Sequence, residues 1–584
     1  MKLLKKVSVY QKIKEVGIST LIILVILVFP SKLKGQNALL IPDTLSGTTI
    51  DLTLQNGIYQ FYEGQNTTTM GANGNILGPT LLLNQGDFVN FSVNNQLADT
   101  STIHWHGLHV APENDGGPHT PIPPNTTWNP SFTILDKAAT YWYHPHLHRF
   151  TNKHVSKGIA GMIIVRDAEE SGLTLPRKYG VDDFPLVIQT KDFDSNYEIV
   201  VPSNADDIIM VNATINPFLK VPAQVIRYRI LNGSSQRIFN IGLTNNQSFY
   251  QIASDGGLLN TPNETTRLML APGERAEILI DFAGMNGQTV YLRSFASELP
   301  NGIYGATNPG MGAGMTLDGY NPNALNGADF NILQFNIINE ASEAITTIPT
   351  TLVNETPIEE NTVNVTRVLT FSPVSTGMNQ LNGEFLINNR SFNENVIDYT
   401  IKINNTEIWK LTNQSAIAHP FHIHDVQFYI LTRNGNTPPI NERGRKDVVL
   451  VKAQETVRFI AKFEDFSNTA VPYMYHCHML PHEDGGMMGQ FVVGDAPLSI
   501  EEKFNTNDLI NIYPNPVTDY VNIQIKGNLT TEDIQIYDRL GRIVRDAKIS
   551  SGKNKIKITG LPSGIFFLKM RIGDKEIIKK ILVK

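Results

Sequence analysis

The sequence predicts an all-β protein, because short β patterns recur along the chain and turn signals separate them. Asn, Thr, Ile, Val, Gly and Pro are plentiful, whereas long amphipathic helical patterns are scarce after residue 40. Repeated short strands with Asn/Gly turns are typical of antiparallel β-sandwiches. With 584 residues, the chain has room for roughly three to five domains of this kind.

The N-terminus predicts export. An apolar run from Ile18 to Phe29 follows five lysines, and this run is shorter than the roughly 18 to 20 residues that span a bilayer. Residues 1–35, ending on the small residue Gly35, are therefore typical of a secretory signal peptide. A membrane anchor is the alternative. We expect no stable membrane span in the mature protein. The lysines are Lys2, Lys5, Lys6, Lys12 and Lys14.

The overall charge argues against one class of partner. Charged residues make up 18% of the chain and the formal net charge is −7. A protein that binds a polyanion usually carries a basic surface. We therefore expect no nucleic-acid partner.

Two sandwich domains are expected before the middle of the chain. The first spans about 40–167 and includes β patterns at Phe88–Val93 and Gly158–Val165. After a polar connector, the second spans about 184–339, with an alternating pattern at Ile226–Ile230 and a strand at Glu277–Phe282. This second block contains no histidine, so we expect a spacer without metal ligands.

A third sandwich domain and a smaller terminal module complete the predicted order. The third domain spans about 366–494, with an alternating strand at Val457–Phe463. A linker at 495–508 follows. The terminal module, about 509–584, has β patterns but neither His nor Cys, so no metal chemistry is expected there. These patterns are Val521–Ile525, Ile534–Tyr537, Ile565–Met570 and Ile577–Lys584.

The stretch around Cys477 predicts a copper site. Cys477 is the only cysteine of the chain, and His482 and Met487 follow it by five and ten residues. A thiolate, imidazoles and a distant thioether are the ligands of a blue-copper centre, which His419 completes. One cysteine cannot form an intramolecular disulfide, which favours a ligand over a leftover thiol. A buried structural cysteine beside chance histidines is the alternative.

Histidines flank this cysteine and also occur in pairs elsewhere. If Met474–His478 is a strand, Cys477 faces one way while His476 and His478 face the other, so one tripeptide can ligate two centres. Four His-x-His pairs, two from the first block and two from the third, suit a cluster of copper ions at a domain interface. The pairs are His104/His106, His144/His146, His422/His424 and His476/His478. The remaining His109, His119, His148 and His154 are expected at the surface or behind the ligands, and His148 continues the alternation of His144 and His146.

The motifs that carry these histidines resemble those of the multicopper oxidases. The nearest resemblance is to the laccase-like, bacterial three-domain branch that includes cuprous oxidases and bilirubin oxidases, and it covers about 45–494. It implies three cupredoxin-like Greek-key sandwiches and a small C-terminal β-sandwich. The motifs are His-Trp-His-Gly at 104–107, Tyr-His-Pro-His at 143–146, His-Pro-Phe-His-Ile-His at 419–424 and the run 476–487.

This resemblance implies four copper ions with distinct ligands. The type 1 copper takes His419, Cys477, His482 and Met487, and the type 2 copper takes His104 and His422. One type 3 copper takes His106, His144 and His478, and the other takes His146, His424 and His476.

The resemblance also implies a reaction. A small reducing substrate gives single electrons to the type 1 copper, electrons cross from Cys477 to His476 and His478, and the cluster reduces O2 to water. Asp115 and Glu483 match acidic positions that deliver protons in relatives. Ordinary turn and cap carboxylates are the alternative for both.

The substrate is less defined than the reaction. Relatives that oxidise Cu(I) carry an acid and a Met before the type 1 His, where this chain has Ser415 and Ile417. Phenols or aromatic amines are therefore expected before Cu(I) or other metal ions. The alternatives are a cuprous or metal-ion oxidase for copper tolerance, a copper nitrite reductase, and a non-catalytic copper-binding envelope protein. We expect a monomer.

The terminal module resembles the type A sorting domain of the type IX secretion system. This implies passage from the periplasm across the outer membrane of a Gram-negative bacterium, followed by release or surface attachment. A carbohydrate-binding or adhesive module is the alternative. The motifs that carry the likeness are Tyr-Pro-Asn-Pro at 513–516, Asp-Arg-Leu-Gly-Arg at 538–542 and Leu-Pro-Ser-Gly at 561–564.

Overall fold

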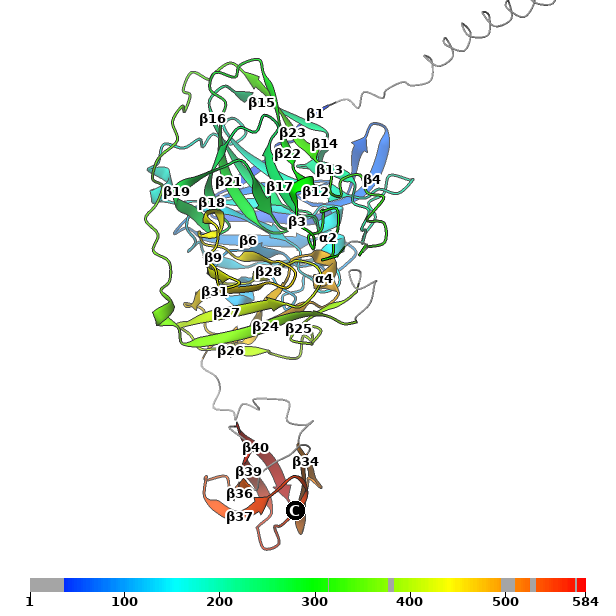
Figure 1. Cartoon of the computed structure of the whole chain (residues 1–584), viewed down its shortest axis with the longest axis vertical. Helices are drawn as coiled ribbons and strands as arrows, with labels where there is room; N and C mark the ends of the chain where they lie inside the picture. Colours follow the sequence, from blue (N-terminus) through cyan, green and yellow to red (C-terminus); the bar gives the residue numbers. More distant parts are fainter. Residues whose placement is uncertain (1–35, 313–314, 376–382, 495–509, 526–531, 573–574) are drawn as a thin grey trace, which may run out of the picture. The chain divides into compact units, whose positions relative to one another are not determined.

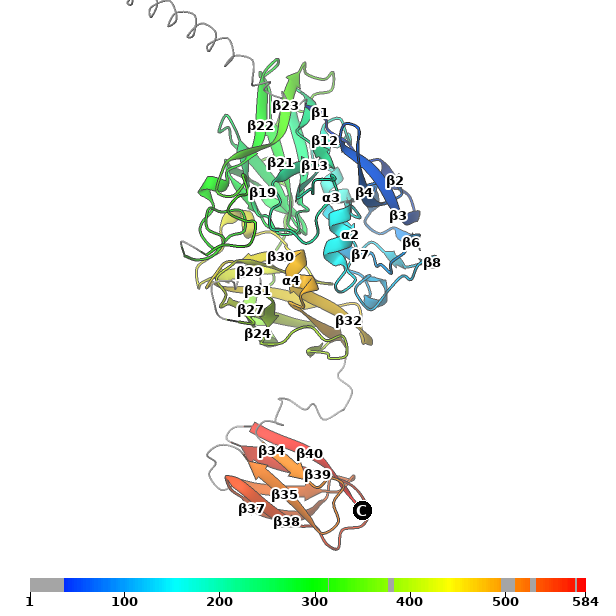
Figure 2. The ribbon, with the colours of Figure 1, turned by 90° about the vertical axis from the view of Figure 1, so that its right-hand side faces the viewer.

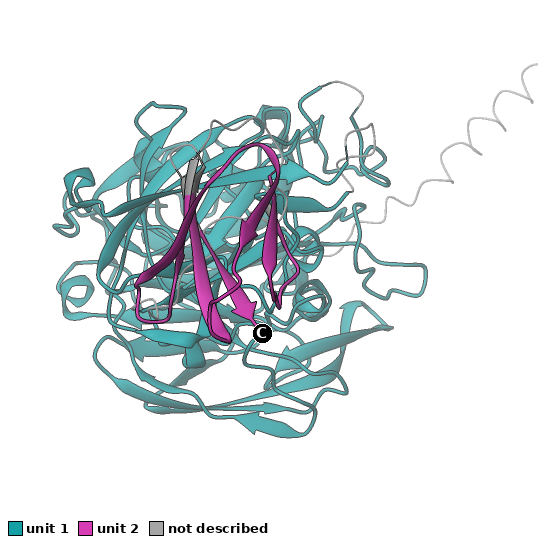
Figure 3. Ribbon diagram, turned by 90° about the horizontal axis from the view of Figure 1, so that it is seen from below, with its two compact units in different colours: residues 1–495 teal, residues 496–584 magenta. Residues whose placement is uncertain are grey.

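The computed structural model confirms the expected all-β class (Figure 1). It describes residues 36–312, 315–375, 383–494, 510–525, 532–572 and 575–584, so the expected signal peptide and the linker at 495–508 lie outside the described residues. The chain divides into two compact units, residues 1–495 and 496–584 (Figure 3). None of the helices in the described ranges has the length and apolar character required to cross a membrane.

The first block folds into two sheets around an apolar core that includes Leu52, Phe91 and Trp105. The first sheet is β2 (Thr44–Ser46), β5 (Thr80–Asn84), β11 (Gly161–Arg166), β10 (Ala139–His144) and β7 (His104–His106). The second is β4 (Gln65–Ala72), β3 (Thr49–Tyr62), β6 (Phe88–Asn95), β8 (Thr126–Trp128) and β9 (Ser131–Thr133).

The middle block has larger sheets, with a core that includes Tyr228, Phe239 and Ile278. One sheet is β1 (Asn37–Ala38), β15 (Pro217–Pro222), β23 (Phe330–Ile338), β22 (Thr289–Ser294), β17 (Phe239–Leu243) and β20 (Leu268–Leu270). The other is β14 (Thr214–Ile215), β13 (Ile208–Val211), β12 (Asp183–Lys191), β16 (Val225–Asn232), β21 (Arg275–Asp281), β18 (Phe249–Ser254) and β19 (Gly257–Thr265).

The third block again pairs two sheets, around Trp409, Phe421 and Phe459. One is β25 (Phe385–Ile387), β24 (Val365–Pro373), β27 (Asn405–Asn413), β31 (Thr456–Phe463) and β29 (Tyr429–Arg433). The other is β26 (Tyr399–Ile401), β33 (Met488–Val493), β32 (Asn468–Cys477), β28 (His419–Ile423) and β30 (Val448–Val451).

The terminal module also has two sheets, around Val521, Ile536 and Leu568. One is β34 (Ile510–Tyr513), β35 (Tyr520–Ile525) and β38 (Gly552–Lys557). The other is β37 (Ile543–Ile549), β36 (Glu532–Tyr537), β39 (Gly564–Ile572) and β40 (Lys575–Val583).

Helices are short and lie in the connections. Figures 1 and 2 place α2 beside α4, where Asp484 of α4 accepts hydrogen bonds from the backbone N–H groups of Thr151 and Asn152 at the start of α2. Within the described residues, the helices are η1 (Pro112–Asn114), α2 (Thr151–Lys157), α3 (Ala168–Ser171), η2 (Ala296–Glu298), η3 (Glu360–Thr362), η5 (Ile440–Glu442) and α4 (Leu480–Asp484).

The sheets are mixed, so the expectation of antiparallel sandwiches is incomplete. Parallel pairs join β3 to β6, β5 to β11, β12 to β16, β15 to β23, β24 to β27 and β26 to β33. Each pair joins strands that are distant in sequence, so crossover connections bring them side by side. Short strands and turn signals do not report such pairings, which depend on how the layers close.

The alternating strand β16 differs from a half-exposed strand. Its residues are buried on both faces, and Arg227 and Arg229 are each about 1% exposed. Both guanidinium groups donate to Glu277, while Arg229 also donates to Asp183 and to Thr140 of the first block. Burial opposes ionisation of Glu277, but the two arginines outweigh it and lower its pKa to about 2. The polar face of this strand therefore forms a domain interface, because buried charges require partners.

Candidate metal centre

The histidine pairs lie on or at the ends of two strand pairs, one in the first block and one in the third. His104 and His106 are both in β7, whereas His146, His424 and His478 follow the ends of β10, β28 and β32. In the first block β7 pairs with β10, which sets His104 opposite His144. In the third block β28 pairs with β32, which sets His422 opposite His476. The two sets of rings meet face to face: His104 stacks on His424 with centroids 3.8 Å apart, and His106 stacks on His422 at 3.7 Å.

The eight paired histidines converge in three buried groups. Within each group, one potential ligand atom from every residue lies within 4.8 Å of the others. The groups are His104/His106/His422, His106/His144/His478 and His146/His424/His476. A further group combines His104 and His424 with Asp115.

In the group of His146, His424 and His476, carboxylates support the rings from behind. The Nε2 atom of His146 lies 3.0 Å from that of His476 and 3.1 Å from that of His424. On the opposite edges, His424 Nδ1 donates to Asp115 Oδ2 at 2.8 Å. Glu483 lies 3.3 Å from His146 Nδ1 and 3.2 Å from His476 Nδ1. The three Nε2 atoms are therefore directed inward together.

The group of His106, His144 and His478 has a different surrounding. His106 Nδ1 lies 3.3 Å from His144 Nε2, and His144 Nδ1 donates to the Pro145 carbonyl. The opposite nitrogen of His106, Nε2, lies 3.1 Å from Asp447 Oδ1. Here His106 presents Nδ1 to the group, unlike the Nε2 atoms of the other set.

Backbone carbonyls fix the remaining two rings. His104 Nδ1 donates to the Asp115 carbonyl at 2.9 Å, and His422 Nδ1 donates to the Asp447 carbonyl at 2.8 Å. The Nε2 atoms of both rings are buried without a hydrogen-bond partner among the described residues. A buried nitrogen with a free lone pair is costly unless something binds it.

A separate cluster of potential ligands, here called the thiol group, consists of His419, Cys477 and His482. Cys477 lies on the face of β32 opposite to His476. Cys477 Sγ is 3.5 Å from His419 Nδ1 and 3.6 Å from His482 Nδ1. The backbone N–H of Cys477 donates to the Met487 carbonyl, which holds that methionine against the cysteine. Phe385 packs on both imidazoles, with centroids 4.6 and 4.5 Å away.

The donor set fits copper ions. Neutral imidazole is the ligand form, and burial favours it by lowering histidine pKa values. Burial also raises the pKa of the Cys477 thiol, so a bound cation would be needed to hold the thiolate. Burial lowers the pKa of His146, His478 and His482 to about 3, and lowers that of His106, His144, His419, His422 and His424 well below 6.5.

The other four histidines lie outside these groups. The ring of His148 contacts Phe392, although its position in the sequence continues the alternation. His119 donates to Gln490 Oε1 at 2.6 Å. His154 is buried in α2 beside Ser101, so the expected surface position is wrong for it.

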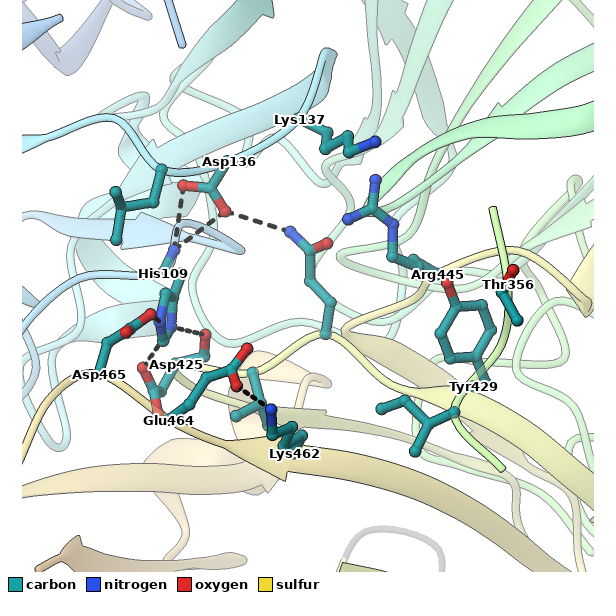
Figure 4. Close-up of a pocket in the computed structure, with 14 residues that line it drawn as sticks. His109, Asp136, Lys137, Thr356, Asp425, Tyr429, Arg445, Lys462, Glu464 and Asp465 are labelled. Carbon is teal, nitrogen blue, oxygen red and sulfur yellow. Dashed lines mark hydrogen bonds and ion pairs between the residues drawn. The ribbon is translucent and has the colours of Figure 1, made fainter. Parts of the chain in front are cut away.

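His109 lines a separate pocket of about 360 Å³ between the first and third blocks (Figure 4). Its Nδ1 lies 2.8 Å from Asp425 Oδ1, its Nε2 lies 3.1 Å from Asp465, and its backbone N–H donates to Asp136. Burial opposes its charge, but Asp425 and Asp136 outweigh this effect and raise the pKa of His109 to about 10.

Sequence reasoning missed the contribution of the middle block. Arg275 forms two 2.6 Å hydrogen bonds to Asp447, and Gly273 lies against the ring of His478. The prediction that the middle block is only a spacer is therefore incomplete. Neither residue stands in a histidine motif, and no local pattern connects them with sites more than 170 residues away along the chain.

Comparisons with known proteins agree with this geometry. Family models described as "Multicopper oxidase" match residues 53–170 and 367–497. A model described as "Secretion system C-terminal sorting domain" matches residues 511–584.

Similar proteins cover most of the chain. "Multicopper oxidase mco" of Staphylococcus haemolyticus is 33% identical, covering 79% of this chain and 93% of that protein. "Cell division protein FtsP" of Xenorhabdus nematophila is 31% identical, covering 78% and 91%. The solved structure of a laccase-like multicopper oxidase, CueO from Ochrobactrum sp., is 31% identical, with a TM-score of 0.68, covering 78% of this chain and all of that one.

The charged His109 predicts a pH-dependent contribution to stability. Its folded pKa of about 10 lies above the ordinary 6.5, so its stabilisation is complete below about pH 6.5 and is lost as the pH rises through about 10. We expect His109→Gln to lower the thermal midpoint more at about pH 6 than above about pH 10. His119→Gln serves as the control. An equal loss for His109→Gln at both pH values would contradict the assignment.

Proposed function

This chain belongs to the multicopper oxidase family and is an oxidase, and from that premise we propose its electron donor and its site roles. The donor is a phenol or aromatic amine that gives one electron at a time at the Cys477 group. Four such electrons, together with four protons, would reduce O2 to two waters at the histidine cluster. One copper ion sits in the Cys477 group and three in the cluster.

One observation carries this proposal. Cys477 lies in the thiol group, while the residues on either side of it, His476 and His478, belong to two different cluster groups. Copper supplies one-electron redox chemistry when bound. The backbone of this tripeptide is then the shortest covalent connection between donor side and O2 side.

The ligand assignments follow the groups. We assign His419, Cys477, His482 and Met487 to type 1 copper, and His104 with His422 to type 2. The type 3 pair takes His106/His144/His478 and His146/His424/His476. The convergent nitrogens and the opposite nitrogens held by acceptors support this distribution.

Asp115 and Glu483 are proposed to supply protons. Asp115 holds the Nδ1 proton of His424, and Glu483 lies against His146 and His476, so both acids border one face of the cluster. Burial opposes ionisation of Glu483, but His146 and His476 outweigh it and lower its pKa. An ionised, buried carboxylate in hydrogen-bond reach of the ligands can accept a proton and pass it on beside the place where water forms.

The donor site is a cavity of about 520 Å³ lined by His482. His482 Nδ1 faces the thiol, so the opposite edge of the ring is the part that can reach a bound donor. Gln236 donates its amide N–H groups to Ser203 and Asn204, which leaves its carbonyl oxygen as an acceptor. Asp318 adds an exposed carboxylate. The wall therefore offers acceptors to the hydroxyl or amino group of a small organic donor.

Metal ions fit this cavity less well than small organic donors do. The lining contains one carboxylate and no Met among the described residues, whereas Cu(I) prefers soft ligands. Beside the thiol group, Ser415 provides a neutral hydroxyl 2.9 Å from His419 Nε2. The laccase-like relative acts on lignin model compounds, which supports an organic donor here. A metal-ion oxidase and a non-catalytic envelope protein remain the competing proposals, and the complete ligand set favours catalysis.

The terminal module supports secretion. We propose that it is a type IX sorting signal of a Gram-negative bacterium, which takes the oxidase through the periplasm to the cell surface or the medium.

Replacing Cys477 tests the mechanism. Cys477→Ser exchanges a soft thiolate for a poor ligand, so the type 1 copper and its blue absorption should be lost. The histidine cluster should keep about three of about four coppers, while oxygen uptake collapses because electrons cannot enter. Copper content, visible spectrum and oxygen uptake are compared with wild type. A serine variant that keeps its oxidase activity would refute the mechanism.

Replacing Asp318 tests the donor site. We expect wild type to oxidise 2,6-dimethoxyphenol and N,N-dimethyl-p-phenylenediamine faster than Cu(I). Asp318→Asn should raise KM for the diamine, up to about fivefold because the carboxylate is exposed, and should change the phenol less. Asp51→Asn, which also removes one exposed carboxylate, is the control. A higher kcat/KM for Cu(I) than for either organic donor would contradict the assigned class.

Deleting residues 505–584 tests secretion. The truncated oxidase should remain active but accumulate inside the cell envelope. Activity and protein are measured in the medium, on the surface and in the periplasm. Normal amounts of truncated protein outside the cell would show that the terminal module is not required for secretion.

A further inference from the structure

The middle block reaches every member of one histidine group, directly at His478 and through one intervening side chain at His106 and His144. Gly273, in the connection between β20 and β21, has a φ of +84°, and a Cβ atom there would lie 2.9 Å from His478 Cγ. Arg275, two residues later, donates to both carboxylate oxygens of Asp447, and Asp447 Oδ1 lies 3.1 Å from His106 Nε2. These contacts reach two members of the group His106/His144/His478.

The third member is reached through an aromatic ring. Trp142 stacks on His144, with centroids 4.1 Å apart and an interplanar angle of 27°. Trp142 also packs in a buried cluster with Val187 of β12 and Leu231 of β16. The middle block thus forms the wall behind His106, His144 and His478.

The partner group is supported differently. Among the described residues, the side chains that hold His146, His424 and His476 at their outer nitrogens are Asp115 of the first block and Glu483 of the third. One group is therefore surrounded by acids, and the other by an arginine-bound carboxylate, a glycine and an indole.

We propose that the middle domain is a structural part of one copper position, and that its docking controls copper loading at His106/His144/His478. This inference rests on the proposed function, because it assigns one type 3 copper to that group. Arg275 and Gly273 act as positioning residues. The two positions of the pair then load unequally when the middle domain is displaced.

The physical basis is the choice of ligand nitrogen on His106. A neutral imidazole carries its proton on either nitrogen, and a hydrogen bond at one of them selects the other as the ligand. Asp447 accepts at Nε2, which leaves Nδ1 directed towards His144. The planar guanidinium group of Arg275 fixes that carboxylate through two hydrogen bonds. Gly273 is required because any side chain there would push against His478.

The test compares variants of this wall with a matched interface variant. Arg275→Lys keeps the positive charge but cannot form the bidentate hydrogen bond to Asp447. Gly273→Ala introduces a Cβ atom against His478. Arg229→Met is the control, because it removes a buried arginine from the same interface without contacting a histidine. Each full-length protein is loaded with copper and dialysed against a chelator. Copper per chain, the blue absorption and the electron paramagnetic resonance spectrum are then measured, and thermal midpoints report folding.

Both wall variants should bind one copper fewer than wild type, with the affinity at that position lowered about 10- to 100-fold. Their blue absorption should be unchanged. The remaining ion of the pair, no longer spin-coupled to a neighbour, should give a new paramagnetic signal. The control should keep the wild-type copper count even where its thermal midpoint falls.

Three results would overturn the inference. Wall variants with the wild-type copper count would show that the middle domain does not control loading. Loss of all cluster copper from the wall variants and from Arg229→Met alike would show general loosening of the interface. A wild-type protein that binds no copper would refute the proposed function itself. That result differs from the two above, which would refute only the role of the middle domain.

Discussion

Burying eight imidazole rings in one place imposes a constraint on the whole protein. Each ring has two polar nitrogens, and neither can remain without a partner in an apolar interior except at a cost. His104, His422 and His424 meet this constraint in the same way: an acceptor holds one nitrogen, and the other is directed to the shared centre. The acceptors therefore determine which nitrogen is available to a metal.

This constraint links domains that are far apart in sequence. Asp447 accepts from one ring through its backbone carbonyl and lies against another through its carboxylate, while Arg275 of the middle block holds that carboxylate. Removing one member of such a buried network leaves an unpaired charge, which is more costly than the net value of the pair. The metal centre and the domain interface are for this reason parts of one arrangement.

The thiol site and the histidine cluster share a strand but differ in their surroundings. Cys477 and its imidazoles lie among apolar and aromatic side chains, and His482 lines a cavity of about 520 Å³. The cluster is lined by carboxylates on one side. Because side chains alternate along β32, Cys477 and His476 lie on opposite faces of one strand, and its thickness separates the thiol site from the cluster.

The sequence by itself determined the fold class and the candidate ligands. Alternation and turn signals are local, so β16 and β31 were predicted close to their actual bounds. The His-x-His spacing identified the candidate ligands, although of the four pairs only His104/His106 lies wholly within a strand. Only the tertiary structure decided what surrounds those ligands. The parallel pairings, the buried arginine face of β16 and the approach of Gly273 and Arg275 to the histidines all join distant segments. Such contacts leave no periodic signal, because they depend on how whole sheets pack against each other.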